Sequence, residues 1–222
     1  MARSYHKLRN LHEYITNAPA SKPRAGVEGA ILAGGKSRRM GRDKLLLPLG
    51  SRTLLERVQA ALYPLVDRIR VIGRDPVPEI GLFAQPDLRP GLGPLSGIHA
   101  ALATARAGNV IVTACDLPFV TTAFLGGLLE RLSPEIDAVV PCPEGKPVAV
   151  CALYRASCLE ILESRLDRGE LAAGDFARSL EARFLDDRDL RTIDPSGRCL
   201  LNLNTPSDYE RALSLLKNES KT

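Results

Sequence analysis

Short apolar runs and helical repeats of apolar residues alternate along most of this chain. The runs are typical of strands in a sheet covered on both faces, and they predict strands at 27–32, 68–72, 82–84, 109–113, 138–141 and 148–154. Apolar residues at helical spacing predict helices at 53–62, 94–107, 122–132, 158–166 and 207–217. Turn residues lie between the last two predicted strands, so we expect these two strands to form a hairpin.

Three of the predicted helices begin with a start signal in the sequence. Thr53 and Glu56 have the spacing of a capping box, in which each side chain bonds the other residue's backbone amide. Thr205 followed by Pro206 predicts a cap and a first-turn proline for the last helix. Ser96 is expected to cap the helix over residues 94–107. These signals place the beginnings of helices along the chain.

Strands and helices alternate from Val27 to about Ala138. This order predicts an α/β fold, a three-layer Rossmann-like arrangement with a mostly parallel sheet and helices on both faces. In such sheets ligands bind beyond the carboxyl ends of the strands. We expect a single domain over residues 27–217, preceded by a basic extension over residues 1–26 and followed by a short tail over residues 218–222.

The net charge of +4 is concentrated in the extension. Of 30 basic and 26 acidic residues, five basic and one acidic lie in the first 26 positions, which leaves 25 of each elsewhere. A neutral body argues against a broad nucleic-acid surface. The five cysteines have neither CxxC nor zinc-ligand spacing, and no apolar run reaches the ~18 residues of a membrane span. We therefore expect a cytoplasmic protein with reduced thiols and with neither nucleic acid nor membrane as a partner.

The segment Leu32–Lys44, with the sequence LAGGKSRRMGRDK, directly follows the first predicted strand. Gly34 and Gly35 let the backbone approach a ligand closely and turn amides toward phosphate oxygens. Arg39 and Lys44 bring cations to the same place. The spacing matches neither a Walker A loop nor the GxGxxG fingerprint. A basic surface turn is the alternative, but the strand, the glycines and the cations together favour a phosphate site.

Two acidic residues also follow predicted strands. Asp116 ends the apolar run of VTACDLP, where a carboxylate is suited to Mg²⁺ together with phosphate oxygens and water. Asp87 precedes the segment GLGPLSG, whose Gly93-Pro94 leads into a helix and offers free amides to an anion. An ordinary turn or capping role is the alternative for each acid. The position after a strand favours a ligand site.

Two amides alternate near the carboxyl end of the chain. Asn202 and Asn204 in LNLNTP are two positions apart, so they share one face if the segment is a strand. Each amide offers both donors and an acceptor to a polar ring. Asn204 can also serve only as a turn residue before Thr205-Pro206. We expect a strand that carries both side chains to the edge where Asp116 lies.

These four segments together resemble the motifs of the molybdenum cofactor guanylyltransferases and, more loosely, of other nucleotidyltransferases that activate small molecules with nucleoside triphosphates. The resemblance extends over about residues 27–217 and implies a nucleotidyltransferase fold. It implies catalysis by Lys44, Asp116 and Arg39, with Mg²⁺ on Asp116 and the pterin substrate on Asn202 and Asn204. It implies that the nucleotide is bound by Leu32, Ala33, Gly34, Gly35, Lys44, Asp87 and Asp116. One departure concerns Gly73, where some members carry an asparagine that contacts the nucleotide.

The implied reaction transfers GMP from GTP to the terminal phosphate of molybdopterin, giving molybdopterin guanine dinucleotide and pyrophosphate. The attacking phosphate is already anionic, so the reaction requires positioning and charge neutralisation and no protein nucleophile. In the resemblance, Gly35 in the LAGG string favours guanine, because cytidine-using relatives tend to have LAAG in place of LAGG and DQP in place of CDLP. The alternatives are a cytidylyltransferase, a sugar-phosphate nucleotidyltransferase and a non-enzymatic carrier of the cofactor. Beyond the two substrates, the implied partners are molybdopterin-synthesis proteins and client molybdoenzymes, in transient contact.

Overall fold

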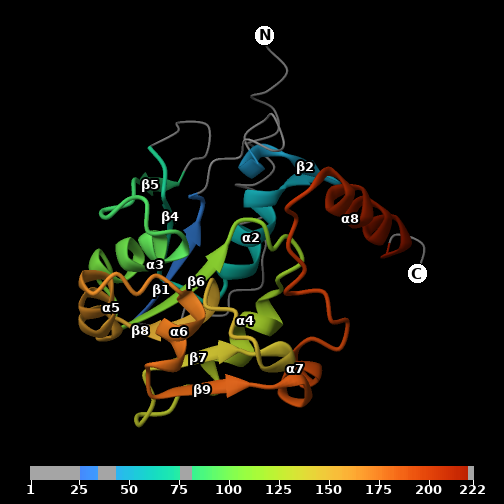
Figure 1. Cartoon of the computed structure of the whole chain (residues 1–222). Coiled ribbons are helices and arrows are strands. Elements are labelled where there is room, and N and C mark those ends of the chain that lie inside the picture. The colour runs from blue at the N-terminus through green and yellow to red at the C-terminus, as the bar shows by residue number, and fades with distance from the viewer. Residues whose placement is uncertain (1–25, 35–43, 76–81, 220–222) are drawn as a thin grey trace.

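The computed structural model of the chain describes residues 26–34, 44–75 and 82–219. Its centre is a seven-stranded sheet, in which the described strands are arranged in the order β5-β4-β1-β6-β8-β7-β9 (Figure 1). Their bounds in that order are Phe83–Gln85, Arg68–Ile72, Val27–Leu32, Asn109–Ala114, Cys151–Arg155, Ala138–Pro141 and Ala182–Leu185. Residues 1–25 of the predicted basic extension lie outside the described residues.

One strand of this sheet runs against the others. β1 pairs in parallel with β4 and β6, β4 with β5, and β7 with β9. β8 pairs in antiparallel fashion with both of its neighbours, β6 and β7. The predicted hairpin between β7 and β8 is therefore confirmed, as is the mostly parallel sheet. The amino end of β8 lies at the edge where β1, β4, β5 and β6 have their carboxyl ends.

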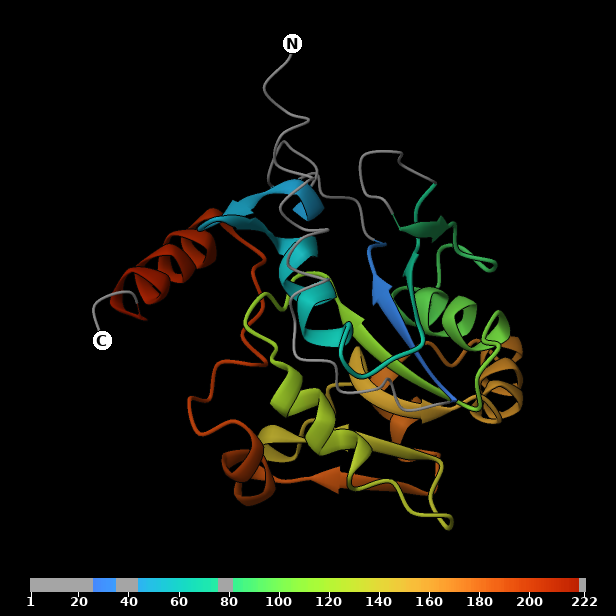
Figure 2. The same ribbon diagram turned by 180° about the vertical axis from the view of Figure 1, so that it is seen from behind.

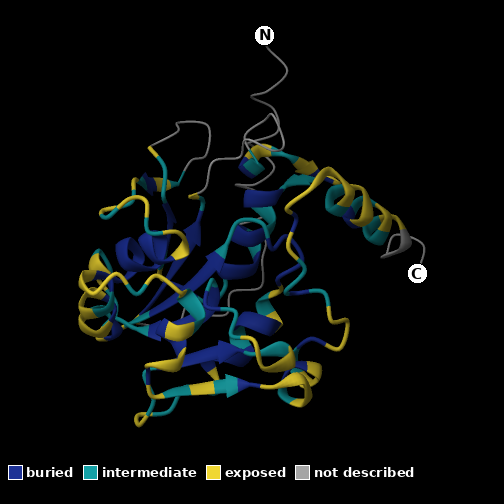
Figure 3. Ribbon diagram, in the orientation of Figure 1, coloured by how far each residue is buried: buried dark blue, intermediate teal, exposed yellow. Residues whose placement is uncertain are grey.

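Helices cover both faces of the sheet, which confirms the three-layer α/β prediction. α2 (Leu54–Leu62), α4 (Thr122–Leu129) and α7 (Asp187–Ile193) contribute to one apolar cluster. α3 (Pro94–Ala103), α5 (Cys158–Asp167) and α6 (Ala173–Arg178) contribute to another. Figure 2 shows this division from behind, and Figure 3 shows the buried sheet between the exposed outer surfaces of the helices.

The alternation of side chains along the central strands produces the two clusters. In β1, all six residues are buried. Ile31 packs in the cluster with α2 and α4, whereas Ala30 and Leu32 pack in the cluster with α3 and α5. Successive side chains of a strand point to opposite faces, so a strand that is covered on both faces is mostly apolar, and the one charged residue of β1, Glu28, is paired.

A third and smaller apolar cluster lies outside these two layers. It joins the short hairpin of β2 (Pro48–Leu49) and β3 (Arg52–Thr53) to α8 (Pro206–Glu219). Leu49, Phe119 and Leu203 are among its buried residues. The hydroxyl of Tyr209 on α8 also donates a hydrogen bond to the carbonyl of Pro48. The hairpin and α8 lie side by side in both ribbon views (Figures 1 and 2).

A buried ion pair ties α3 to the sheet. Arg70 of β4 is fully buried, and its Nε lies 3.0 Å from Oε2 of Glu28 on β1. The same guanidinium donates a hydrogen bond to the carbonyl of Ala101, 2.9 Å away, and another to the hydroxyl of Thr104. Removing one partner of a buried pair leaves an uncompensated charge and is strongly destabilising. The pair thus fixes the carboxyl end of α3, whose amino end lies at the cavity described below.

Most of the predicted helix starts are confirmed, and one is wrong. Thr53 and Glu56 form the complete capping box, and the Thr205 hydroxyl accepts a hydrogen bond from the Asp208 amide. Ser96 does not cap α3, because the capping residue is Gly93 and has no side-chain hydrogen bond. The Ser96 hydroxyl instead accepts from the amide of Leu92, 2.9 Å away, and closes the loop in front of the helix.

The segment of the two asparagines is also different from the prediction. Residues 201–204 form no strand, so the predicted strand there is wrong. Asn202 and Asn204 are nevertheless exposed, with the buried Leu203 between them.

Within the described residues, no helix is both long enough and apolar enough to cross a membrane.

Candidate active site

A cavity of about 1120 Å³ opens at the edge of the sheet where β1, β4, β5 and β6 end. The residues that follow these four strands contribute to its wall: Ala33 and Gly34, Gly73, Asp87, and Cys115 and Asp116. The amino end of α3 adds Pro94, Ser96 and Gly97. This is the place where open α/β sheets bind ligands.

Lys44 and Asp116 face each other in this cavity. Lys44 begins the short 3-10 helix η1 (Lys44–Leu46), and its Nζ lies 3.1 Å from Oδ2 of Asp116. The two side chains are 15% and 24% exposed, so the pair is partly shielded from water while it still borders the cavity. The Lys44 Nζ also lies 3.4 Å from Oδ1 of Asn204. A cation, a carboxylate and an amide from distant parts of the sequence therefore meet at one point.

Backbone contacts hold Asn204 beside the other two residues. The Leu203 amide donates to the carbonyl of Asp116, 2.9 Å away, which fixes the segment 201–204 against the end of β6. The Asp208 carboxylate accepts from the amides of Asn204 and Thr205, both at 2.8 Å. These two amides lower the pKa of Asp208, and the nearby charge of Lys44 adds to the effect. The turn is thus closed by an ionised carboxylate.

Two glycines meet where β1 and β4 end. Gly73 has φ of +91°, a conformation that L side chains rarely adopt. A Cβ built on Gly73 would lie 2.7 Å from both the Cα and the nitrogen of Gly34. The sequence departure at Gly73 therefore has a physical reason: the backbone of Gly34 occupies the space that any side chain would need. The two loops approach closely on the wall of the cavity.

The Asp87 carboxylate lies against this glycine contact. A Cβ built on Gly34 would be 3.5 Å from Oδ2 of Asp87, and one built on Gly73 would be 3.3 Å from Oδ1. Oδ1 is buried and has no hydrogen-bond partner among the described residues. Burial raises the pKa of the Asp87 carboxyl, because the charged form loses hydration. The Asp87 carboxylate also lines the cavity, where it is available to a ligand N–H or O–H.

The structure brings most of the predicted site residues together. Eight of them line the same cavity: Leu32, Ala33, Gly34, Lys44, Asp87, Asp116, Asn202 and Asn204. Gly35 and Arg39, which were predicted for the same loop, lie outside the described residues. The cavity also has apolar lining that the sequence interpretation missed, namely Val148, Val150 and Leu200. Only the reversed direction of β8 brings the first two to this edge, and no motif in the sequence marks them.

The backbone at the end of β1 is partly committed to the sheet. The Ala33 amide donates to the carbonyl of Ile72 at 2.7 Å, and the carbonyl of Leu32 accepts from the Cys115 amide at 3.0 Å. The Ala33 amide is therefore not a donor to a ligand in this structure. A carbonyl oxygen has two lone pairs, so Leu32 keeps acceptor capacity.

The Asp116 carboxylate has the hard oxygens that suit a divalent cation. Within the described residues, no group of three or more histidine, cysteine, aspartate or glutamate side chains is arranged to hold a metal ion. The carboxylate borders the cavity and faces the Lys44 ammonium, so it fits a cation that completes its ligands with phosphate oxygens and water.

All five cysteines lie in the described part of the chain, and no disulfide joins any of them.

Comparison with known proteins agrees with this geometry. The family model described as MobA-like NTP transferase domain matches residues 29–184. The chain belongs to this family. The molybdenum cofactor guanylyltransferase of Desulfosudis oleivorans is 32% identical over 194 residues, which cover 86% of this chain and 96% of the relative. A protein of Carboxydothermus hydrogenoformans named as a probable molybdenum cofactor guanylyltransferase is 34% identical over 84% of this chain and 94% of its own.

A solved structure shows the same fold. The crystal structure of molybdopterin-guanine dinucleotide biosynthesis protein A from Archaeoglobus fulgidus has a TM-score of 0.73 and 28% sequence identity. The match covers 86% of this chain and 99% of that one. The MobA-like family and the nucleotidyltransferase fold that the sequence motifs predicted are therefore both confirmed.

Proposed function

We propose that the protein transfers GMP from GTP to the terminal phosphate of molybdopterin and releases pyrophosphate. The observation that carries this proposal is the meeting of Lys44, Asp116 and Asn204 in one cavity, across from Gly34 and Asp87. The names of the relatives support the same donor and acceptor. A cation beside a carboxylate at the end of parallel strands suits the neutralisation of a triphosphate.

The nucleotide would occupy the side of the cavity formed by β1, β4 and β5. Gly34 lets the backbone approach the ligand, and the Asp87 carboxylate, which lines the cavity, would accept a hydrogen bond from the base or the sugar. The amino end of α3 borders the same side and favours negative charge. Lys44 would hold the phosphates, together with Arg39, whose role rests on the family resemblance because it lies outside the described residues.

In the reaction, an oxygen of the acceptor's terminal phosphate attacks the α-phosphorus of GTP. A new P–O–P linkage forms, and the bond between the α-phosphorus and its bridging oxygen to the β-phosphorus breaks, so that the electron pair leaves with pyrophosphate. Lys44 neutralises charge that develops on the phosphate oxygens. Mg²⁺ held by Asp116 would supply further neutralisation when bound. Asn202 and Asn204 would hold the acceptor at the opposite end of the cavity.

A panel of nucleotides tests this function. Purified protein is incubated with Mg²⁺, molybdopterin and each nucleoside triphosphate in turn, and pyrophosphate release is measured together with the dinucleotide product. We expect GTP to support the fastest turnover. Better turnover with CTP would make the protein a cytidylyltransferase, and turnover with a sugar phosphate in place of molybdopterin would reassign the acceptor. Binding of molybdopterin with no pyrophosphate from any nucleotide would indicate a carrier.

Manganese and calcium in place of Mg²⁺ extend the same assay to the metal. The catalytic role of Asp116 requires a divalent cation, so a chelator is expected to abolish turnover of the wild-type protein.

We also place the reaction in the cytoplasm, in agreement with the free cysteines.

A further inference from the structure

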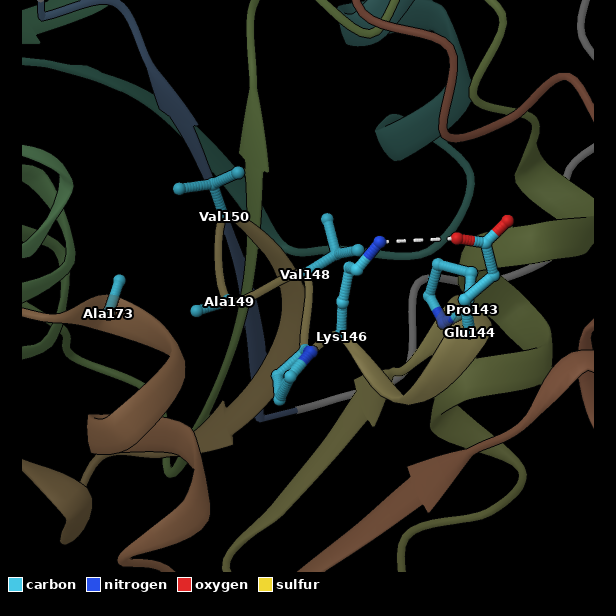
Figure 4. A pocket seen from close by; sticks show the side chains of 8 residues that line it. Pro143, Glu144, Lys146, Val148, Ala149, Val150 and Ala173 are labelled. Atoms are coloured by element: carbon cyan, nitrogen blue, oxygen red, sulfur yellow. Dashed lines mark hydrogen bonds and ion pairs between the residues drawn. The ribbon is translucent and has the colours of Figure 1, made fainter.

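A second cavity adjoins the proposed active site. It has a volume of about 510 Å³ and lies between the β7–β8 connection and the start of α6. Val148 and Val150 line both cavities, so the two share a wall. Figure 4 shows these two valines beside the charged residues of the connection. The second cavity lies on the β8 and β7 side of Asp116, away from the strands that carry Gly34 and Asp87.

The walls and the rim of this cavity differ in chemistry. Its walls are small and apolar, and they include Pro143, Pro147, Ala149 and Ala173. At the rim, Lys146 Nζ lies 3.2 Å from Oε2 of Glu144, and the two side chains are 81% and 76% exposed (Figure 4). An ion pair so open to solvent contributes little to folding stability. Each of the two charged groups can therefore leave its partner and bind a ligand instead, at a small cost in free energy.

The backbone beneath this exposed pair is held in place. Glu144 has φ of +51° and is the one non-glycine residue with positive φ among those that the structure describes. Its amide faces the Asp187 carboxylate of α7, with oxygens at 3.3 and 3.4 Å. Arg178 of α6 donates to the carbonyl of Gly145 at 2.8 Å. A non-glycine residue in this region of φ is uncommon and persists where its surroundings hold it.

We infer that this second cavity is the subsite for the ring system of the acceptor, with Glu144 and Lys146 as its polar contacts. The inference rests on the proposed function, because it takes the acceptor to be a phosphorylated pterin. A pterin ring is flat, and one edge carries an amino group, a ring N–H and a carbonyl. A carboxylate accepts from the amino group and the ring N–H together, and an ammonium donates to the carbonyl. The apolar walls suit the ring faces.

The position of the cavity agrees with the path of the acceptor. The acceptor's phosphate must reach the point where Lys44, Asp116 and Asn204 meet. Its ring must then extend away from the nucleotide, and the shared wall of Val148 and Val150 leads from that point into the second cavity. The charges of Glu144 and Lys146 thus determine which ring is accepted, whereas Lys44 and Asp116 act on the phosphates.

Three variants test the subsite. Lys146→Ala and Glu144→Gln each remove one polar contact at the rim, and Ala173→Leu fills part of the cavity without touching the main one. The matched controls are Arg168→Ala and Glu170→Gln, which change another exposed ion pair, 2.7 Å apart, that lines neither cavity. For each protein, KM is measured separately for molybdopterin and for GTP. Binding of 6-hydroxymethylpterin phosphate is measured by its fluorescence without turnover.

We expect Lys146→Ala and Glu144→Gln to raise KM for molybdopterin and Kd for the probe by roughly tenfold, the effect of losing one hydrogen bond to a charged group. Ala173→Leu should raise both further, while KM for GTP and kcat stay within about twofold of the controls. Unchanged molybdopterin KM and probe Kd in all three variants, with the dinucleotide still formed, would overturn the subsite and leave the proposed function intact. If probe binding depends on Glu144 and Lys146 but no nucleotide is transferred, the result would support the subsite and overturn the proposed function.

Discussion

Lys44 and Asp116 are 72 positions apart in the sequence, and their side chains form an ion pair of 3.1 Å at the wall of the main cavity. In the proposed reaction, Lys44 binds the phosphates and Asp116 binds the metal, so the two side chains no longer contact only each other. We therefore expect the pair to contribute to catalysis more than to folding stability. Lys44→Ala and Asp116→Ala should each lower turnover by at least ~10²-fold, the effect typical of losing one preorganised electrostatic group.

Thermal unfolding provides the control for these two variants. The pair borders the open cavity, where water can solvate the group that remains, so the melting temperature should change little in either variant. Lys217→Ala, which removes an exposed lysine of α8, serves as the matched substitution and should keep full turnover. If either site variant retains near-wild-type turnover, that residue is not part of the catalytic machinery.

The second prediction concerns the two asparagines. Asn204→Ala should weaken molybdopterin binding several-fold, since one hydrogen bond is worth about 1 kcal/mol. GTP affinity should stay within about twofold. Asn202→Ala provides the comparison, because Asn202 is also exposed and lines the same cavity. Titration of each ligand by calorimetry measures both affinities. Weaker GTP binding with unchanged pterin binding would reverse the assignment.

The third prediction uses the contact between Gly34 and Gly73. Gly73→Ala should destabilise the protein by about 1–3 kcal/mol, because its φ is unfavourable for alanine and its Cβ would meet the Gly34 backbone. Gly108→Ala is the control, since its Cβ would have no neighbour within 4 Å and its φ is not positive. Urea unfolding measures both variants. Equal stability of the two would show that the loops move apart without cost.

The fourth prediction follows from the burial of Asp87. Burial raises the pKa of this carboxyl in the folded state. Its stabilising contribution is therefore present below its ordinary pKa and is lost as the pH rises through the folded-state pKa. Asp87→Asn should make the protein at least as stable as the wild type at pH 7, with no such advantage near pH 3. Melting curves at the two pH values measure this difference.

The same substitution should weaken GTP binding by roughly tenfold, because an acceptor of hydrogen bonds is replaced in part by a donor. A gain in stability together with a loss of affinity would identify Asp87 as a residue kept for the ligand. A variant that is less stable at pH 7 and binds GTP normally would assign Asp87 a structural role.

The strands and the strand-end residues could be predicted from the sequence because they depend on local patterns. β1 and β4 have the predicted bounds, and Asp87 and Asp116 follow strands as expected. The apolar runs are unambiguous there because both faces of the sheet are covered. β9, with the pattern ARFL, was missed, since it has only four residues, of which Leu185 alone is buried, and so short a segment gives no clear alternation.

The contacts between distant segments could not be predicted in the same way. No local pattern places Val148 and Val150 beside Asn204, or α8 against the β2–β3 hairpin. The alternation of Asn202 and Asn204 was identified correctly, but the segment bonds to Asp116 through one amide and forms no strand. Single contacts of this kind depend on the tertiary fold and have no periodic signal.

The reversed direction of β8 gives the two proposed substrate sites separate chain segments. A parallel strand would enter the sheet at the far edge, and the connection before it would lie away from the chemistry. Because β8 is antiparallel to β6 and β7, the connection from 142 to 150 borders the cavity. On the proposed assignment of the sites, substitutions in that connection would change the contacts to the acceptor and leave the segments after β1, β4 and β6 untouched. A change of acceptor would then require changes in one loop, with the proposed nucleotide contacts retained.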